Sequence, residues 1–352
     1  MNDNVLADTL SLHRGFWTGE AGPVVAWSGH APLSALTMPL AGGKSVNEDM
    51  PLTPEQVDPM LLVELEESPS RPRLQPDRPG AVSGDVLVVR PPYGRMCWVE
   101  AVMGCPVAVR VDSGSIYSEP YLDGPSDLGR LPSHYENGWL DLLGRLTRAL
   151  VDNSDGAYHV TLPLMRGTID LVAALLGYER MCFSLYDEPK QLRKLIERSV
   201  EAYMAVADEV YGVIPRLEGG TVSRFNVWAP GSVAITQCDA SAVTSPGQYE
   251  EFFFPFDAET CARFDYSVVH LHSGYLHTVD TLLRADYPTA IQVSLDTGST
   301  PLTVHDLIPL FKKVLERKPL FITGPCTKRE LDELLASLPH KGLCIVAELM
   351  DA

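Results

Sequence analysis

The sequence lacks several features that would assign it to a particular class of protein. No stretch approaches the roughly 18 to 20 consecutive apolar residues that a membrane-spanning helix needs. The first residues, MNDNVLADTLSLHRGFW, include acidic side chains and have neither the basic start nor the apolar core of a signal peptide. We therefore expect a cytoplasmic protein with no membrane partner.

Positive charge is also scarce. The 28 Lys and Arg residues stand against 46 Asp and Glu residues, which gives a formal net charge of -18 at pH 7. A chain with this charge repels phosphate backbones and anionic lipids, and it contains no basic patch to offset the repulsion. Nucleic acid is therefore not an expected partner.

Cysteine pairs and nucleotide-binding loops are missing as well. The seven cysteines are scattered and none belongs to a CxxC pair, which argues against a disulfide framework and for reduced thiols. The sequence contains no P-loop, no GxGxxG loop and no internal repeat. With 352 residues and 45% hydrophobic content, the chain can bury a large core, as one α/β barrel or as two smaller domains.

Short β-rich runs alternate with longer helical patterns from Asp85 onward. The clearest helix is expected at 187–211, with Asp187 as its N-cap and Gly212 at its end. Such alternation predicts an α/β fold in which helices wrap parallel strands. The β-rich runs are DVLVVR, HVTLPL, TVSRFNVW, VAITQCDA, SVVHLHSG, AIQVSLDTG, PLFITG and LCIVAE, and VVAW near the amino terminus is a further candidate.

Turn-forming residues dominate the beginning of the chain. Residues 1–80, including a proline-rich stretch at 68–80, are expected to form an N-terminal covering extension and loops, and residues 81–352 the barrel. In such a barrel, active-site groups gather at the carboxyl ends of the strands. The residues expected at or just after these ends are His270, His272, Asp239, Asp296 and Cys326.

Three of these residues form a candidate metal site. His270 and His272 are two apart on a strand, so both imidazoles lie on one face. Cys326 precedes Thr327, which with Glu330 has the spacing of a capping box, so the thiol is expected at a strand-to-helix corner. Two nitrogens and a sulfur with an open fourth position suit a catalytic Zn²⁺. The alternative is a structural thiol and two hydrogen-bonded core histidines.

Other residues are candidates for catalysis and substrate binding. Asp239 and Asp296 could orient a nucleophile or move a proton, and Asp239 is also a reserve metal ligand. Arg166 could hold a carboxylate or phosphate, or could pair with Asp170. Trp228 could wall the pocket, although an aromatic residue at this place is more often part of the core. Arg166, Asp170 and Trp228 are thus expected to bind substrate.

From about residue 98 to the end, the order of motifs resembles the uroporphyrinogen decarboxylase superfamily. The resemblance is most specific in SPGQYEEFFFPF, which follows an acidic strand end. It implies a single (β/α)8 TIM barrel. The other motifs that carry it are WVEAVMGCPV, PLMRGTIDLVAALLG, DEPKQLRKLIE, FNVWAPG, CDASAV, HLHSG, SLDTG and ITGPCTKRELDELL.

The superfamily has two broad chemistries. The haem-pathway decarboxylase uses no metal and has an arginine-rich N-terminal motif that this chain lacks. The other branch consists of zinc-dependent methyltransferases that work with corrinoid proteins, and it binds zinc through His-x-Cys and a later Cys. His270 matches the family histidine, His272 occupies the first cysteine position, and Cys326 matches the second.

The resemblance therefore implies a zinc-dependent methyltransferase that moves a methyl group between a corrinoid on a separate protein and a small molecule. The rival expectation is a metal-independent decarboxylase or lyase of a small carboxylated substrate, which would use Arg166, Asp170 and the histidines. A non-catalytic relative of the barrel is a third. The expected partners are a small-molecule substrate and a corrinoid protein, and a homodimer is a candidate assembly.

Overall fold

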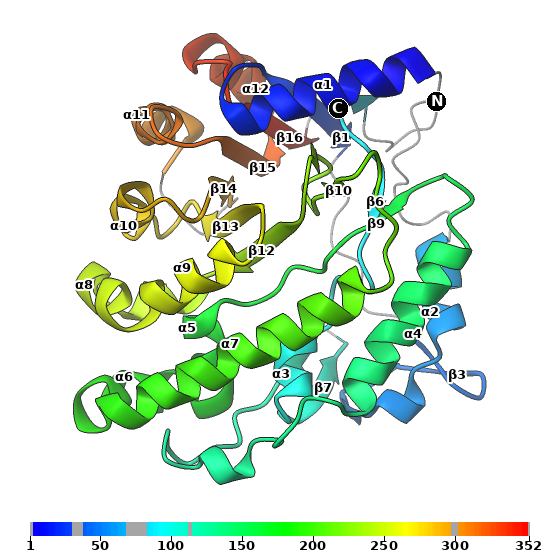
Figure 1. Ribbon diagram of the computed structural model, residues 1–352, viewed down its shortest axis with the longest axis vertical. Coiled ribbons are helices and arrows are strands. Elements are labelled where there is room, and N and C mark those ends of the chain that lie inside the picture. Colours follow the sequence, from blue (N-terminus) through cyan, green and yellow to red (C-terminus); the bar gives the residue numbers. More distant parts are fainter. Residues whose placement is uncertain (1–2, 30–37, 68–82, 112–114, 297–301, 351–352) are drawn as a thin grey trace.

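A computed structural model gives the fold of the chain, which Figure 1 shows as a ribbon. The proline-rich loop expected at 68–80 lies outside the described residues. The residues described are 3–29, 38–67, 83–111, 115–296 and 302–350.

A mainly parallel sheet forms the centre of the fold. Six strands pair in parallel, and a short seventh strand pairs antiparallel at the edge beside β1. In spatial order the strands are β12 (Val233–Gln237), β13 (Tyr266–His272), β14 (Ala290–Ser294), β15 (Leu320–Cys326), β16 (Leu343–Leu349), β1 (Val24–Gly29) and β5 (Ser83–Gly84).

Alternation of side chains along these strands separates two cores. Val268 and Phe321 belong to one apolar cluster, whereas Val269 and Ile322, one residue further along each strand, belong to another. This is the two-residue period of a strand, applied to a sheet that is buried on both faces.

The remaining strands are short and form small separate sheets. β6 (Val89–Arg90) and β9 (His159–Val160) pair in parallel. Each has only two residues, because Pro91 and Pro163 follow within a few positions and cannot donate a backbone hydrogen bond. The other short strands are β2 (Pro39–Leu40), β3 (Lys44–Ser45), β4 (Met50–Leu52), β7 (Val107–Arg110), β8 (Ser115–Ser118), β10 (Thr221–Val222) and β11 (Trp228–Ala229).

Helices cover the sheet in two groups. Figure 1 shows α9 to α12 along one side of β12 to β15, and α2 to α7 in the other half of the molecule. The helices are α1 (Asp3–Thr18), α2 (Pro59–Glu67), α3 (Trp98–Val102), α4 (Gly138–Asp152), α5 (Thr168–Leu176), α6 (Tyr178–Asp187), α7 (Pro189–Tyr211), α8 (Pro246–Gln248), α9 (Phe254–Ala262), α10 (Val279–Arg284), α11 (Val304–Leu315) and α12 (Lys328–Ser337). Short 3-10 or π turns lie at Pro54–Gln56, Leu128–Arg130, Asp239–Val243 and Tyr249–Phe253.

Helix α1 packs on the amino-terminal half of the strands through aromatic contacts. The rings of Phe16 and Phe321 meet edge to face with centroids 4.7 Å apart, a contact typically worth about 0.5–1.5 kcal/mol beyond its buried area. His13, fully buried, accepts a hydrogen bond from the backbone N–H of Trp228 at Nδ1 and approaches the carbonyl oxygen of Asp85 at 2.6 Å through Nε2. Since a carbonyl only accepts, Nε2 carries the proton and the ring is neutral. α1 is thereby tied to two distant segments.

The expected α/β class is confirmed, with two differences in detail. Among the described residues the hydrogen-bonded strands do not close into a ring. The strand β1 lies within residues 1–80 yet pairs with β16 in the main sheet.

No described helix is long and apolar enough to cross a membrane.

Helix ends follow the expected chemistry in one case and depart from it in another. Thr327 and Glu330 form the expected capping box of α12. Asp187, expected as the N-cap of a single helix, is instead the last residue of α6, and Glu188 is the N-cap of α7. Pro189 explains the shift, because proline fits the first turn of a helix and disfavours helical geometry in the residue before it.

Candidate metal centre

The two histidines lie where β13 ends. His270 is the backbone partner of Gln292 on β14, and His272 is the partner of Ser294. Because residues two apart on a strand face the same way, both imidazoles lie on one side of the sheet at its carboxyl edge. The sequence prediction that this pair shares a face is confirmed by their side-chain contact.

A chain of hydrogen bonds sets the orientation of His270. Gln292 donates through Nε2 to Oγ1 of Thr323 at 2.8 Å, so its carbonyl oxygen Oε1 faces the imidazole. Nδ1 of His270 contacts that oxygen and must therefore carry the proton. In the neutral ring, Nε2 then carries no proton and has a free lone pair. Burial lowers the pKa of His270 and favours this neutral form.

A carboxylate sets the orientation of His272. Nδ1 of His272 lies 2.7 Å from Oδ1 of Asp296, so this nitrogen also carries a proton. The hydroxyl of Ser273 donates to Oδ2 of Asp296 at 3.3 Å and accepts from its backbone N–H at 3.0 Å, which fixes the carboxylate. Nε2 of His272 is thus the nitrogen left to face the centre.

The two Nε2 atoms face each other at 3.2 Å. Two imidazole lone pairs at this distance repel, and either a proton on one ring or a cation between the rings relieves the repulsion. Oδ2 of Asp239 lies 3.8 Å from Nε2 of His272. Asp239, His270 and His272 form a group whose ligand atoms all lie within 4.8 Å of one another.

These residues fit a zinc ion. Ligands that each lie about 2.0–2.1 Å from a tetrahedral Zn²⁺ are about 3.3–3.4 Å apart, close to the distance between the two imidazole nitrogens. Oδ1 of Asp239 is buried and has no hydrogen-bond partner among the described residues. A buried carboxylate oxygen without a partner is costly, and a cation would satisfy it.

Asp239 is itself held from two sides. The side-chain amide of Gln237 donates to its Oδ2 at 2.9 Å. The backbone N–H groups of Asp239 and Ala240 donate to the buried carboxylate of Asp170, at 3.2 and 2.6 Å. Burial and the nearby Asp239 charge raise the pKa of Asp170. Asp170 therefore positions the turn that carries Asp239.

Tyr275 closes one side of the centre. Its ring packs against His272 with centroids 5.5 Å apart. Burial raises the pKa of Tyr275, and the nearby Asp239 carboxylate raises it further, so its hydroxyl keeps its proton.

Cys326 is not brought together with the histidines in this way. It is fully buried at the end of β15 within the same apolar cluster as Ile322, and it is not part of the group of ligand-capable atoms. On β15 it is Thr323 that shares the face of the histidines, through Gln292. Cys326 is three residues beyond Thr323 on a strand that stays paired with β16 as far as Cys326, so its side chain lies on the opposite face. The structure places Asp239, expected as an acid and reserve ligand, beside the pair instead.

Trp228 and Arg166, which were both expected to bind substrate, have different surroundings in the structure. Trp228 packs in a small cluster with Leu10 and Leu87 and donates through its indole N–H to the carbonyl of Leu217, so it is part of the core there. Arg166 pairs with the buried Glu100, Nη1 to Oε1 at 3.0 Å.

Sequence reasoning missed Glu100, Gln292 and Thr323. For Glu100 and Gln292 the available signal was a polar side chain inside an apolar run, in WVEAV and in AIQVS, and for Thr323 it was the hydroxyl after LFI. A buried polar group needs a partner, so each of these residues predicts a hydrogen bond but does not identify the partner.

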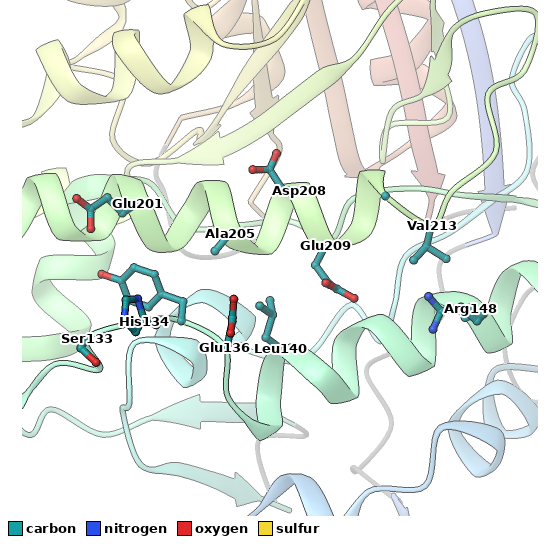
Figure 2. A pocket seen from close by; sticks show the side chains of 12 residues that line it. Ser133, His134, Glu136, Leu140, Arg148, Glu201, Ala205, Asp208, Glu209 and Val213 are labelled. Carbon is teal, nitrogen blue, oxygen red and sulfur yellow. The ribbon is translucent and has the colours of Figure 1, made fainter.

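A larger cavity lies away from the histidine pair. It has a volume of about 620 Å³ and lies between α7 on one side and α4 with the segment that leads into it on the other. Figure 2 shows the acidic side chains of Glu136, Glu201 and Glu209 along it, together with Arg148 and the apolar Leu140. Cavity size alone therefore does not locate the candidate centre.

Comparisons with known proteins bear mainly on the fold. The chain matches no protein-family model, and it matches no curated protein in sequence. Among solved structures, a methyltransferase from Methanosarcina mazei is similar, with a TM-score of 0.52 and 15% sequence identity over 75% of this chain and 74% of that chain. At this identity the similarity shows that this chain shares the fold of that methyltransferase.

Proposed function

We propose that this chain is a zinc-dependent methyltransferase that moves a methyl group between a corrinoid on a separate protein and a small-molecule acceptor or donor. The observation that carries the proposal is the pair of facing Nε2 atoms of His270 and His272 beside the Asp239 carboxylate. This centre lies on a fold that a methyltransferase shares.

Each residue has a separate role in this proposal. The ion would be held by His270, His272 and Asp239. Gln292 orients the imidazole of His270, and Asp296 orients that of His272. Zn²⁺ bound here supplies Lewis acidity, which lowers the pKa of an acceptor thiol or water. Tyr275 packs against His272 on one side of the centre.

The donor set bears on the acceptor. Imidazole and carboxylate ligands give less electron density to zinc than thiolates do. A thiol acceptor activated here would therefore be a weaker nucleophile than at a cysteine-rich site. Cys326 stays a proposed ligand only if its side chain turns toward the histidines when metal binds.

The proposal also covers the fold, the location and the assembly of the whole protein. It takes the fold to be a closed (β/α)8 barrel of the uroporphyrinogen decarboxylase superfamily, with the corrinoid protein docking at the mouth formed by the carboxyl ends of the strands. It also takes the protein to be a cytoplasmic homodimer that binds neither nucleic acid nor membrane.

Demethylation of free methylcobalamin tests the activity. The zinc-loaded protein should accelerate transfer of its methyl group to 2-mercaptoethanol or to an amine or alcohol acceptor, followed by the change in the corrinoid absorption spectrum. His272→Ala should abolish the acceleration, and Gln191→Ala on the surface of α7 should not. No acceleration by the zinc-loaded protein with any acceptor would contradict methyl transfer.

A metal-independent decarboxylase is the second candidate. The observation that favours it is the buried Asp170, whose pKa burial raises, close to the Arg166 guanidinium. A carboxyl group that keeps its proton could protonate a carbanion left by decarboxylation. Elemental analysis separates the candidates, because only the methyltransferase proposal requires stoichiometric zinc.

A further inference from the structure

A small cavity adjoins the candidate metal centre. Its volume is about 160 Å³, which corresponds to roughly five water molecules. The side chain of Gln237 lines this cavity and also donates to Oδ2 of Asp239 at 2.9 Å. One side chain thus separates the cavity from the proposed ligand. The wall residues are Gly94, Arg95, Met96, Cys97, Trp98, Val99, Glu100, Ile116, Leu164, Met165, Arg166 and Gln237.

Basic side chains line this cavity. Its lining includes two guanidinium groups, Arg95 and Arg166, and one carboxylate, Glu100, in a protein whose net charge is -18. The cysteine in the wall adds no negative charge, because burial raises the pKa of Cys97 and keeps its thiol protonated. The wall therefore presents guanidinium groups, with Glu100 as its one carboxylate among the lining residues.

The guanidinium of Arg166 is held in place but not enclosed. Glu100 is buried, with 3% of its side chain exposed, whereas 38% of the Arg166 side chain is exposed. Among the described residues the two groups form an ion pair without hydrogen-bond geometry, since Oε1 of Glu100 has no hydrogen-bond partner. Glu100 thus positions Arg166 and leaves part of its planar fork to face a ligand.

The backbone also fixes Arg166 relative to the centre. The N–H of Gly167 donates to the carbonyl oxygen of Gln237 at 2.9 Å, which joins the loop after β9 to the end of β12. A Cβ at Gly167 would lie 2.4 Å from that oxygen, so only glycine permits this approach. Arg166 and Gln237 therefore keep a constant separation.

A third guanidinium lies near both places. Nη1 of Arg224 is 2.8 Å from the position that a Cβ of Gly94 would occupy, and its charge is among the causes that lower the pKa of His270. Arg224 thus lies near both the cavity and the histidine pair.

We propose that this cavity binds the anionic end of the substrate, a small organic acid whose carboxylate or similar headgroup contacts Arg166 and whose short apolar chain packs on the Trp98 and Leu164 walls. The other end would reach past Gln237 to Asp239, His270 and His272. The assignment rests on the proposed function only for the location of this reacting end.

Binding of butanoate and its neutral analogue butanamide to the zinc-loaded protein tests the proposal by calorimetry. Butanoate should bind at least about tenfold more tightly than butanamide, since a hydrogen bond to a charged group is lost with the charge. Arg166→Met should weaken butanoate binding by about tenfold or more and leave butanamide unchanged. The matched control Arg145→Met, on the exposed face of α4, should leave both unchanged.

Removal of Arg166 alone leaves Glu100 buried without its partner, so the double variant R166M/E100Q is measured beside it. Equal binding of the two ligands, or equal effects of Arg166→Met and Arg145→Met, would overturn the proposal. So would a loss of butanoate binding in His272→Ala but not in Arg166→Met, because the headgroup would then bind at the zinc.

Zinc content of the same samples separates this inference from the proposed function. Arg166→Met should retain the zinc of the wild type, because none of the proposed ligands is altered. Arginine-dependent binding of butanoate in a protein that takes up no zinc would leave the cavity assignment standing and remove the methyltransferase proposal. Stoichiometric zinc without any preference for butanoate would remove the cavity assignment and leave the methyltransferase proposal standing.

Discussion

Thr323 accepts a hydrogen bond from the side-chain amide of Gln292 at 2.8 Å, and this bond determines which end of the amide faces His270. The amide oxygen can only accept, so it keeps the proton of His270 on Nδ1 and leaves Nε2 to face His272. A hydroxyl on one strand thus controls the tautomer of an imidazole two strands away.

Metal affinity should depend on this relationship. Gln292→Leu removes the acceptor and should weaken zinc binding about 10- to 100-fold, the usual effect of losing a group that orients a metal-binding histidine. Gln292→Glu keeps an acceptor at the same place and should retain affinity within a few fold. Competition with a chromophoric chelator measures both, with Gln191→Leu as the surface control. Equal affinities of the Leu and Glu variants would show that the tautomer is set in some other way.

The close approach at Gly167 should be intolerant of any side chain. Gly167→Ala places a Cβ 2.4 Å from the carbonyl oxygen of Gln237 and 2.6 Å from Oγ1 of Thr236, so one of the segments has to move. We expect a loss of about 1–3 kcal/mol in the free energy of unfolding, measured in urea. Gly247→Ala, where nothing lies within 4 Å, should cost less than about 1 kcal/mol. Similar losses in the two variants would argue against the close approach.

The buried His13 should make the protein less stable in acid. Burial lowers its pKa to about 4 from an ordinary 6.5, so the unfolded chain binds the proton more tightly. Above pH 6.5 the ring is neutral in both the folded and the unfolded chain, and the free energy of unfolding does not depend on it. As the pH falls from 6.5 toward 4, the unfolded chain takes up the proton first, and the free energy of unfolding decreases by about 3 kcal/mol in all. His13→Gln should show a shallower decline in urea unfolding between pH 7 and pH 4.5. A His13→Gln profile parallel to the wild type would contradict this assignment.

The buried Asp257 should make the protein less stable as the pH rises, the opposite of the effect of His13. It is buried and accepts hydrogen bonds from the backbone and hydroxyl of Thr168 and from the hydroxyl of Tyr249. Burial raises its pKa to about 6 from 3.8, so the folded state binds the proton more tightly. Its contribution is favourable below pH 3.8 and is lost as the pH rises through 6. Relative to wild type, Asp257→Asn should gain about 2–3 kcal/mol between pH 4 and pH 7.5; a constant difference across this range would refute the assignment.

Sequence reasoning located the histidine pair because its geometry is local. His270 and His272 are two residues apart on one strand, and the period of a strand alone puts them on one face. The capping box of Thr327 and Glu330 is local in the same sense, and it was also correct.

The third member of the group depends on the packing of distant segments. Asp239 follows β12, and its distance to His272 is set by the pairing of β12 with β13, which sequence spacing does not contain. Cys326 ends the same strand as Ile322 and lies on the face of Ile322, opposite to that of Thr323, so its side chain enters the core. The pair of Glu100 and Arg166 joins residues far apart in the sequence and has no local signature.

Zinc content of three variants tests the central claim most directly. Wild type, Asp239→Ala, His272→Ala and Cys326→Ala are purified in parallel, and the zinc bound per chain is measured after dialysis against a weak chelator. The account predicts stoichiometric zinc in wild type and in Cys326→Ala and its loss in Asp239→Ala and His272→Ala. Zinc that is lost in Cys326→Ala and retained in Asp239→Ala, or no zinc in wild type, would contradict it.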